Sequence, residues 1–374
     1  MIHNHITYPL SALDLAMVRS VPEGGNWKNI PEHIPSKRLE QIRISGGRTT
    51  LYGRLHRKRP SYTITTYFNR PGNGAYIHPG QDRVISAREA ARLQSFPDNY
   101  VFHGSKTSLC KQIGNAVPPI MAYFIAKRIK QIQKVKNVID LFCGAGGLSI
   151  GFEWAGYNII AANDNFPAAC ETYRNNHKNT LLLEGDVTDR NIKNELIAAA
   201  KNKKIDIVIG GPPCQGFSYA GKRLKDDPRN FLYKEYVEIV EKVKPKVVVI
   251  ENVEGILTSD KGRTYEGIKT DFEELGYKMF GKKMHAVKFG VPQKRKRVVI
   301  IGVLNGDPEE CFPEEIINNE DDFITVDMAI SNLPLLEMNG GENSTNENLK
   351  TENFYQEFLA GKISIEEYYK NLLP

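Results

Sequence analysis

The chain has few cysteines, and no two of them have the spacing of a metal or redox motif. Its five cysteines, an odd number, are scattered over 374 residues, and none forms a Cys-x-x-Cys pair. This scarcity argues against a disulfide framework and against a zinc site. We therefore expect a reducing, cytoplasmic setting and no bound metal.

Long apolar runs are also missing. No run approaches the length of a membrane span, and Met1–His5 lacks the pattern of a signal peptide, so we expect no membrane partner. With 41% hydrophobic and 25% charged residues, the composition is that of an ordinary globular protein. The length allows one large domain and a smaller one.

Acidic residues are scarce in one stretch and dominant in another. Residues 37–70 hold nine Lys and Arg against one acid, a net charge of +8, with tyrosines and a phenylalanine between them. Such a stretch suits a polyanion, although charge alone more often marks a solvated face. Residues 305–374 hold sixteen acids against three lysines, a net of −13. We expect this acidic segment to turn away from nucleic acid or to fold against the basic one.

Strand and helix patterns alternate through the middle of the chain. Short β-branched runs predict strands at 137–142, 157–162, 181–184, 205–209, 246–250 and 297–303. Helical patterns lie between them at 148–155, 167–176, 190–202, 230–243 and 265–275. This rhythm predicts an α/β fold with a doubly wound, mostly parallel sheet.

The rest of the chain has a different pattern. Residues 1–85 are rich in proline and glycine turns and predict a small irregular domain. Ser86–Glu89 is a helix start, and 118–134 reads as one long helix. Segments 284–288 and 297–303 predict a late hairpin, whereas 338–353, rich in Asn, Gly and Glu, predicts a mobile loop.

Three successive predicted strands end in residues suited to an adenosine-bearing ligand. The first leads into the glycine turn Asp140–Gly147, which opens a helix but lacks the Gly-x-Gly-x-x-Gly spacing of dinucleotide sites. The second ends at Asp164, where a carboxylate suits ribose hydroxyls, and the third at Asp186, where one suits an adenine amine. Each residue alone is equally explained as a turn glycine or a helix cap.

A cysteine follows the strand at 205–209 in a stiff loop. Two prolines precede Cys214, which suits a thiolate nucleophile, although a buried cysteine that fills space is an equal alternative. Glu251 ends the next strand and suits a general acid, or else a helix cap. In the basic run at 293–297, alternation puts Gln293, Arg295 and Arg297 on one face.

Taken together, these motifs resemble those of the bacterial DNA cytosine-5 methyltransferases of restriction–modification systems. The matching segments are 140–147, 212–215, 251–253 and 293–297, together with 88–98 and 112–118 nearer the N-terminus. The resemblance implies the Rossmann-like fold of S-adenosyl-L-methionine-dependent methyltransferases and covers most of the chain. It also implies double-stranded DNA as partner, a bacterial cytoplasmic location and, by our expectation, a monomer.

The resemblance implies roles for individual residues. Cys214 would attack C6 of a flipped cytosine, Glu251 would hold or protonate N3, and Arg295 and Arg297 would hold the base and its phosphate. The residues implied for the cofactor are Phe142, Gly144, Ala145, Gly146, Gly147, Asp164, Asp186, Val187, Pro213, Leu232 and Asn115. One departure is Asn165, where the family usually has an apolar or aromatic residue against adenine; Phe166 is the candidate substitute.

DNA contacts are expected from two parts of the chain. Polar residues after the cysteine resemble a loop that closes over DNA: Gln215, Ser218, Lys222 and Arg223, joined by Gln293. Base-reading candidates lie in the basic stretch: Arg43, Arg48, Arg54, Thr63 and Thr65. The run Thr63–Thr66 is also explained as a simple strand.

The order of the motifs differs from the family's usual order. Segments 88–98 and 112–118 normally follow the other motifs, so the chain resembles a circular permutant. We expect 1–85 and 305–374 to build the small target-recognition domain together, with Met1 near Pro374. The catalytic domain would be 86–304, of which 86–135 carries the permuted C-terminal motifs.

Other functions remain open at this point. The same fold acts on RNA in related transfer-RNA methyltransferases, and a non-catalytic DNA-binding regulator is a second alternative. A nicotinamide oxidoreductase is disfavoured by the broken glycine spacing. One subunit of a split enzyme is disfavoured because every major motif is on this chain.

Overall fold

The protein, described here by a computed structural model, folds as two compact units, each assembled from segments distant in the sequence. The structure describes residues 1–213, 232–345 and 349–373. Unit 1 comprises Met1–Ala116, Gly290–Arg295 and the chain from Ile316 onward, and unit 2 comprises Val117–Phe289 and Lys296–Glu315. None of the helices in these described ranges combines the length and the apolar composition that a membrane span requires.

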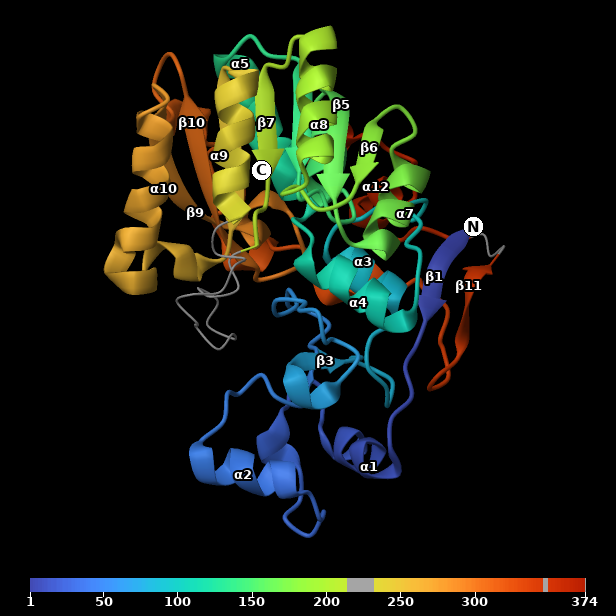
Figure 1. Cartoon of the computed structure of the whole chain (residues 1–374). Coiled ribbons are helices and arrows are strands. Elements are labelled where there is room, and N and C mark those ends of the chain that lie inside the picture. Colours follow the sequence, from blue (N-terminus) through green and yellow to red (C-terminus); the bar gives the residue numbers. More distant parts are fainter. Residues whose placement is uncertain (214–231, 346–348, 374) are drawn as a thin grey trace. The chain divides into compact units, whose positions relative to one another are not determined.

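Unit 2 is built on a seven-stranded sheet in the order β6-β5-β4-β7-β8-β10-β9 (Figure 1). Its strands are β4 (Asn137–Leu141), β5 (Asn158–Asp164), β6 (Leu181–Glu184), β7 (Ile207–Gly210), β8 (Val247–Asn252), β9 (Lys278–His285) and β10 (Lys296–Val303). Strands β4 to β8 pair in parallel, whereas β10 runs antiparallel to both of its neighbours. The predicted mostly parallel sheet is confirmed.

Helices cover both faces of this sheet. Figure 1 shows α8 (Arg190–Asn202), α9 (Leu232–Val243) and α10 (Arg263–Glu273) in front of the strands. Their apolar side chains, among them Leu196, Ile239 and Phe272, form one core with alternate strand residues such as Ile139 and Val208. Helices packed in this way on the sheet are what the predicted doubly wound arrangement requires.

The opposite face is covered by α5 (Pro119–Ile132), α6 (Gly147–Trp154) and α7 (Pro167–Asn176). Asp140, which alternates with the core residues Ile139 and Leu141, accepts a hydrogen bond from Ser149 of α6 on this side. Helices α5 and α6 pack closely because Gly151 has no side chain. A Cβ there would lie 2.5 Å from that of Ala122.

The predicted late hairpin is present, but its first strand was placed wrongly. Strand β9 begins at Lys278 and pairs with β10 along its whole length, from Lys278 opposite Val303 to His285 opposite Lys296. Residues Ala286–Phe289 form a 3-10 turn instead of a strand. The sequence pattern failed because lysines and a glycine interrupt β9, although its backbone pairs regularly.

Unit 1 consists of short elements. Its helices are α1 (Ala12–Ser20), α2 (Lys37–Ser45), α3 (Ala87–Leu93), α4 (Lys106–Asn115), α11 (Val326–Ile330), α12 (Phe354–Leu359) and α13 (Ile365–Leu372). Its strands are β1 (Ile2–Ile6), β2 (Gly53–Arg54), β3 (Ala75–Ile77) and β11 (Gly341–Thr345). The predicted helix start is confirmed: Ser86 and Glu89 cap α3 reciprocally, each side chain bonding the other's backbone N–H.

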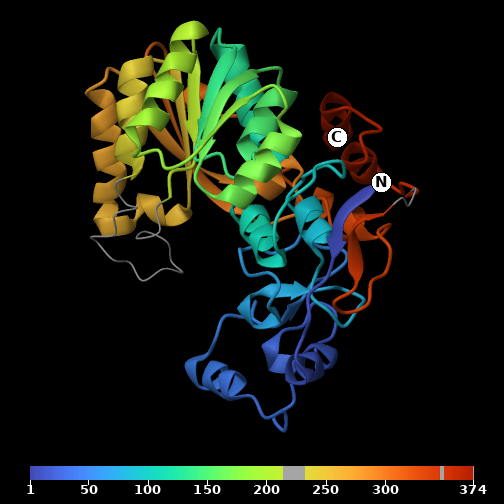
Figure 2. The same cartoon turned by 45° about the vertical axis from the view of Figure 1, so that its right-hand side comes forward.

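The loop expected at 338–353 contains a strand, which corrects that prediction. Strand β11 pairs antiparallel with β1, with Ile2 opposite Thr345 and His5 opposite Glu342, and Figures 1 and 2 show the two side by side. The pairing uses backbone groups, so the polar composition of the segment did not reveal it. Strands from the N-terminal and C-terminal segments thus pair within unit 1; Pro374 lies outside the described residues.

The compact units divide at other positions than those expected for the domains. Residues 86–116 belong to unit 1, where the buried guanidinium of Arg88 donates to the carbonyls of His3, Pro97 and Tyr100. Residues 305–315 belong to unit 2, where α5 holds them: Arg128 donates to the Glu310 carbonyl. These side chain to backbone bonds join segments far apart in sequence, so composition alone did not locate the boundaries.

Candidate active site

The candidate site of unit 2 lies where the parallel strands end. The strand order reverses between β4 and β7, because β5 and β6 follow on one side and β7 and β8 on the other. Ligands of open α/β sheets bind outside the carboxyl ends of the strands at such a switch point. Strand β10 runs antiparallel to β8, so its first residues share this edge.

The glycine turn after β4 has a backbone that accommodates a ligand. Phe142, Gly144 and Gly146 all have positive φ, at 56°, 52° and 84°, and the first is a costly conformation for a phenylalanine. A Cβ on Gly144 would meet nothing within 4 Å. No side chain caps α6 at Gly146, so the helix presents its N-terminal backbone N–H groups to this turn.

The other side of the turn is closed by backbone. A Cβ on Gly147 would collide with the carbonyl oxygen of Val117, so only glycine fits. Val117 follows Asn115 by two residues, which brings this part of the 112–118 motif to the turn. Asn115 itself belongs to unit 1, and its contact with a cofactor remains a prediction.

Acidic side chains follow the next two strands. Asp164 accepts from the backbone N–H of Gly144 and of Phe166, both at 2.8 Å, and burial raises the pKa of its carboxyl. Asp186 is exposed and accepts from Thr188, while Val187 is buried. Oxygens at these strand ends, an open glycine turn and an uncapped helix fit an adenosine-bearing cofactor.

A second carboxyl under the turn is fully buried. Asp140 has no exposed surface; its Oδ2 accepts from Ser149 Oγ at 2.7 Å, and Tyr173 Oη lies 2.7 Å from the same Oγ. Within the described residues, Oδ1 of Asp140 has no hydrogen-bond partner. Burial raises the pKa of Asp140 to about 8. From the sequence, Asp140 was named as the start of the glycine turn but its carboxyl was assigned no role, although an acid within an apolar strand was a visible signal.

The raised pKa of Asp140 predicts a pH dependence of stability. The folded state keeps the proton up to about pH 8, whereas the unfolded state loses it near pH 3.8. The contribution of this bound proton to the free energy of unfolding is therefore complete below the pKa of the unfolded state. It declines by about 1 kcal/mol per pH unit as the pH rises toward the pKa of the folded state. We expect Asp140→Asn to gain stability relative to wild type with rising pH, measured by denaturant unfolding at several pH values.

The control for this series is Glu195→Gln, which removes one negative charge from an exposed position on α8. A difference between Asp140→Asn and wild type that stays constant from about pH 5 to about pH 7 would contradict the assignment.

Residues at the end of β8 contact the loop after β7, residues 211–213, which precedes Cys214. Glu251 is 9% exposed, and its Oε1 forms an ion pair with Nε of Arg297 on β10 at 2.8 Å. Its other oxygen would lie 3.1 Å from a Cβ placed on Gly211, so the carboxylate lies against the loop. Asn252 donates from Nδ2 to the Pro212 carbonyl at 3.1 Å. The structure thus brings Glu251 and Arg297 together beside the segment that precedes Cys214.

Several predicted site residues fall outside the described part of the chain: Cys214, Gln215, Ser218, Lys222 and Arg223. Pro213 and Leu232, which border that segment, are half-buried. Their implied roles stay predictions. In the described ranges, no group of three or more His, Cys, Asp or Glu side chains could hold a metal ion.

Two residues of the basic run were assigned wrongly. Gln293 is fully buried, and its amide bonds Leu93, Gln94 and Ile64 within unit 1. Arg295 is 1% exposed and donates to the carbonyls of Ile64 and Gly114. Both side chains therefore join backbone segments of unit 1 and do not present themselves to DNA. Burial does alternate with the exposed Lys294 and Lys296, but Gln293 and Arg295 contact unit 1, whereas Arg297 of β10 contacts Glu251 of unit 2.

Arg54 is also corrected. It is 7% exposed, and its guanidinium donates to four backbone carbonyls and to Asp82, which occupies all five of its N–H groups. No donor is left for a base. Arg54 instead joins the carbonyls of Val18, Val21, His78 and Gln81.

The remaining base-reading candidates have mixed surroundings. Arg48 and Thr65 are exposed, whereas Arg43 is half-buried and donates to the Ile30 carbonyl. Thr63 donates to the Lys294 carbonyl, and Thr65 Oγ1 lies 2.7 Å from Tyr76 Oη. The run 63–66 is not a strand. Base reading by these four residues stays a prediction.

Fold and site together define a class of protein. The parallel sheet with its switch point, the open glycine turn and the acids at the following strand ends are the Rossmann-like fold of S-adenosyl-L-methionine-dependent methyltransferases. The sequence pattern of one family, C-5 cytosine-specific DNA methylase, matches residues 16–131 and 136–369. The chain belongs to this family.

Relatives match part of the chain. It is 43% identical over 225 residues to the Type II methyltransferase M1.HphI of Haemophilus parahaemolyticus, covering 59% of this chain and 58% of that protein. It is 38% identical over 228 residues to M.DdeI of Desulfomicrobium norvegicum, covering 59% and 54%. The chain thus spans little more than half the length of these relatives. A crystal structure of S. pombe Dnmt2 methyltransferase aligns at 25% identity with a TM-score of 0.38, covering 46% of this chain and 52% of that one.

Proposed function

We propose that this chain transfers a methyl group from S-adenosyl-L-methionine to C5 of cytosine in double-stranded DNA, as a bacterial, cytoplasmic restriction–modification enzyme. One observation carries the proposal. The buried Glu251 carboxylate is paired with Arg297 and lies against Gly211 in the loop that runs into Cys214. In this proposal Cys214 would supply the nucleophile, Glu251 the acid and Arg297 the cation.

The cofactor would be held by the turn after β4 and the acids after β5 and β6. Phe142 and Gly144 would line it, Asp164 would accept from the ribose and Asp186 from the adenine. The bound cofactor supplies an electrophilic methyl group. The neutral form of Asp140, at the end of the strand before the turn, is favoured at neutral pH because burial raises its pKa to about 8.

The chain's own residues would activate the cytosine, a poor nucleophile at C5. The base must leave the stack, because C6 is not accessible inside a duplex. The Cys214 thiolate adds to C6 while Glu251 holds a proton at N3, and the electron pair moves to C5, which takes the methyl group. Loss of the C5 proton to a base then expels the thiolate and restores the ring. Arg297 holds Glu251 and the base in position.

The order of the motifs is proposed to reflect circular permutation. The pairing of β1 with β11 supports it, because the first and last segments build one unit. The family pattern also matches in two segments separated at 132–135, where the permuted join was expected. Unit 1 would then recognise the target sequence.

The function is tested by trapping on DNA in which every cytosine is 5-fluorocytosine, which needs no knowledge of the target. With fluorine at C5 there is no C5 proton for a base to remove, so the thiolate is not expelled and the enzyme and cofactor should yield a covalent adduct that survives denaturing electrophoresis. The variant Cys214→Ala should form none. Cys311→Ala, which alters a buried cysteine elsewhere in unit 2, should still form it. Absence of an adduct with wild-type protein, or its formation only with RNA of the same design, would refute the proposal.

A further inference from the structure

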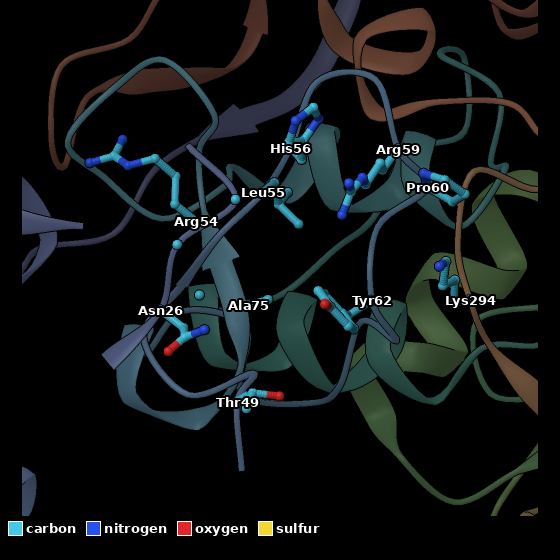
Figure 3. A pocket seen from close by; sticks show the side chains of 13 residues that line it. Asn26, Thr49, Arg54, Leu55, His56, Arg59, Pro60, Tyr62, Ala75 and Lys294 are labelled. Atoms are coloured by element: carbon cyan, nitrogen blue, oxygen red, sulfur yellow. The ribbon is translucent and has the colours of Figure 1, made fainter. Parts of the chain in front are cut away.

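Unit 1 contains a polar cavity that none of the roles above uses. Its volume is about 200 Å³, and its walls include Asn26, Thr49, Arg59, Tyr62 and Lys294 (Figure 3). All of its lining residues belong to unit 1. None of them is Asp or Glu, so the cavity carries positive charge and no carboxylate.

Three Arg and Lys residues line the cavity, and Arg54 is already bonded to backbone carbonyls and Asp82, which leaves two cations to consider. Arg59 and Lys294 are exposed, and within the described ranges neither side chain forms a hydrogen bond or an ion pair. The nearby Glu23 is already engaged by the side chain and the backbone N–H of Arg57. Figure 3 shows the side chain of Arg59 directed toward the cavity and that of Arg54 directed away from it.

Hydrogen bonds to backbone groups position the part of the cavity wall that contains Lys294. Lys294 donates its N–H to the Ser61 carbonyl at 2.8 Å and accepts from Thr63 Oγ1 at 3.2 Å. Ser61 in turn donates from both its N–H and its Oγ to the Pro292 carbonyl. These bonds fix the backbone of Lys294 next to Ser61 and Thr63, so its side chain starts from a defined place in the cavity wall.

Size and chemistry select the ligand. Cavities for whole drug-sized or cofactor molecules hold roughly 300–1,000 Å³, so one of about 200 Å³ is too small for an entire nucleotide. Two unpaired cations with a hydroxyl, an amide and an exposed tyrosine suit one phosphate oxyanion group. A duplex presents such groups at every step of its backbone.

We propose that this cavity binds one phosphodiester group of the DNA substrate, with Arg59 and Lys294 as its cationic ligands. The inference rests on the proposed function, because it takes DNA as the partner. It concerns a phosphate contact that positions the duplex and carries no sequence information. Arg59 belongs to the basic stretch 37–70 that the sequence suggested for a polyanion, whereas Lys294 was expected only to face outward.

The test is the salt dependence of DNA binding by the full chain. The double variant Arg59→Ala/Lys294→Ala should lower affinity equally for all duplex sequences. It should also reduce the slope of log K against log [salt] by about 1, the value for one lost phosphate contact. Both side chains are exposed and unpaired in the described structure, so thermal unfolding should match wild type.

A matched double variant, Lys350→Ala/Lys370→Ala, removes two exposed lysines of unit 1 from the acidic C-terminal segment and should leave the slope unchanged. An unchanged slope for the cavity variant overturns the inference, and a fall of about 2 overturns its single-phosphate form. Trapping on 5-fluorocytosine DNA separates the two proposals. If wild type forms the adduct and the slope is unchanged, only the cavity inference fails; if wild type forms none, the proposed function fails.

Discussion

Replacement of Glu251 by glutamine is expected to slow methyl transfer about 10²–10⁴-fold, the usual contribution of a general acid or base. Glutamine keeps the shape of the side chain but cannot hold a transferable proton at N3 of cytosine. The ion pair with Arg297 also becomes a neutral contact. Single-turnover methylation of duplex DNA at saturating cofactor measures the rate of this step.

Glu254→Gln is the matched control. Glu254 follows β8 by two residues. Like Glu251 it forms an ion pair, here with Lys283 at 2.9 Å, but its side chain is 35% exposed. Its variant should methylate at the wild-type rate. DNA affinity should be unchanged in both variants. A Glu251→Gln rate within a few-fold of wild type would mean that the carboxyl takes no part in proton transfer.

Replacement of Arg92 by methionine is expected to destabilise the protein by about 3–5 kcal/mol, because it leaves a buried carboxylate without its partner. Arg92 is 1% exposed and binds both oxygens of Asp98 at 2.8 Å. It also donates to the Ala329 carbonyl and to Asn332. One side chain thus joins α3 to the C-terminal segment, and denaturant unfolding measures the loss.

The comparison is Arg174→Met, which removes an exposed ion pair between Arg174 and Glu184 with side chains 56% and 38% exposed. Exposed pairs contribute at most about 1 kcal/mol, so this variant should unfold almost as wild type does. Equal losses for the two arginine variants would contradict the importance of burial at Arg92.

The strand–helix order of unit 2 was predictable because its signals are local. The β-branched run before Gly210 forms β7. Asp164 and Glu251 are themselves residues at the ends of β5 and β8. Parallel strands bring such ends to one edge of the sheet, so a linear pattern sufficed to group them. The pairing of β1 with β11 was not visible, because it depends on backbone groups more than three hundred residues apart.

The arginines show most clearly what the sequence alone could not predict. Arg297 and Arg295 stand two residues apart on one alternating pattern, yet one pairs with Glu251 and the other donates to backbone carbonyls of Ile64 and Gly114. Arg54 was expected at DNA and is buried among carbonyls, whereas Arg59 is exposed at a cavity.

Residue order alone therefore established the family motifs, the α/β class and the candidate nucleophile Cys214, since these depend on neighbours along the chain. The folded arrangement decided which cations face solvent and which support the backbone. That choice depends on carbonyl groups contributed by distant segments, because a guanidinium is buried only where enough acceptors converge to replace water.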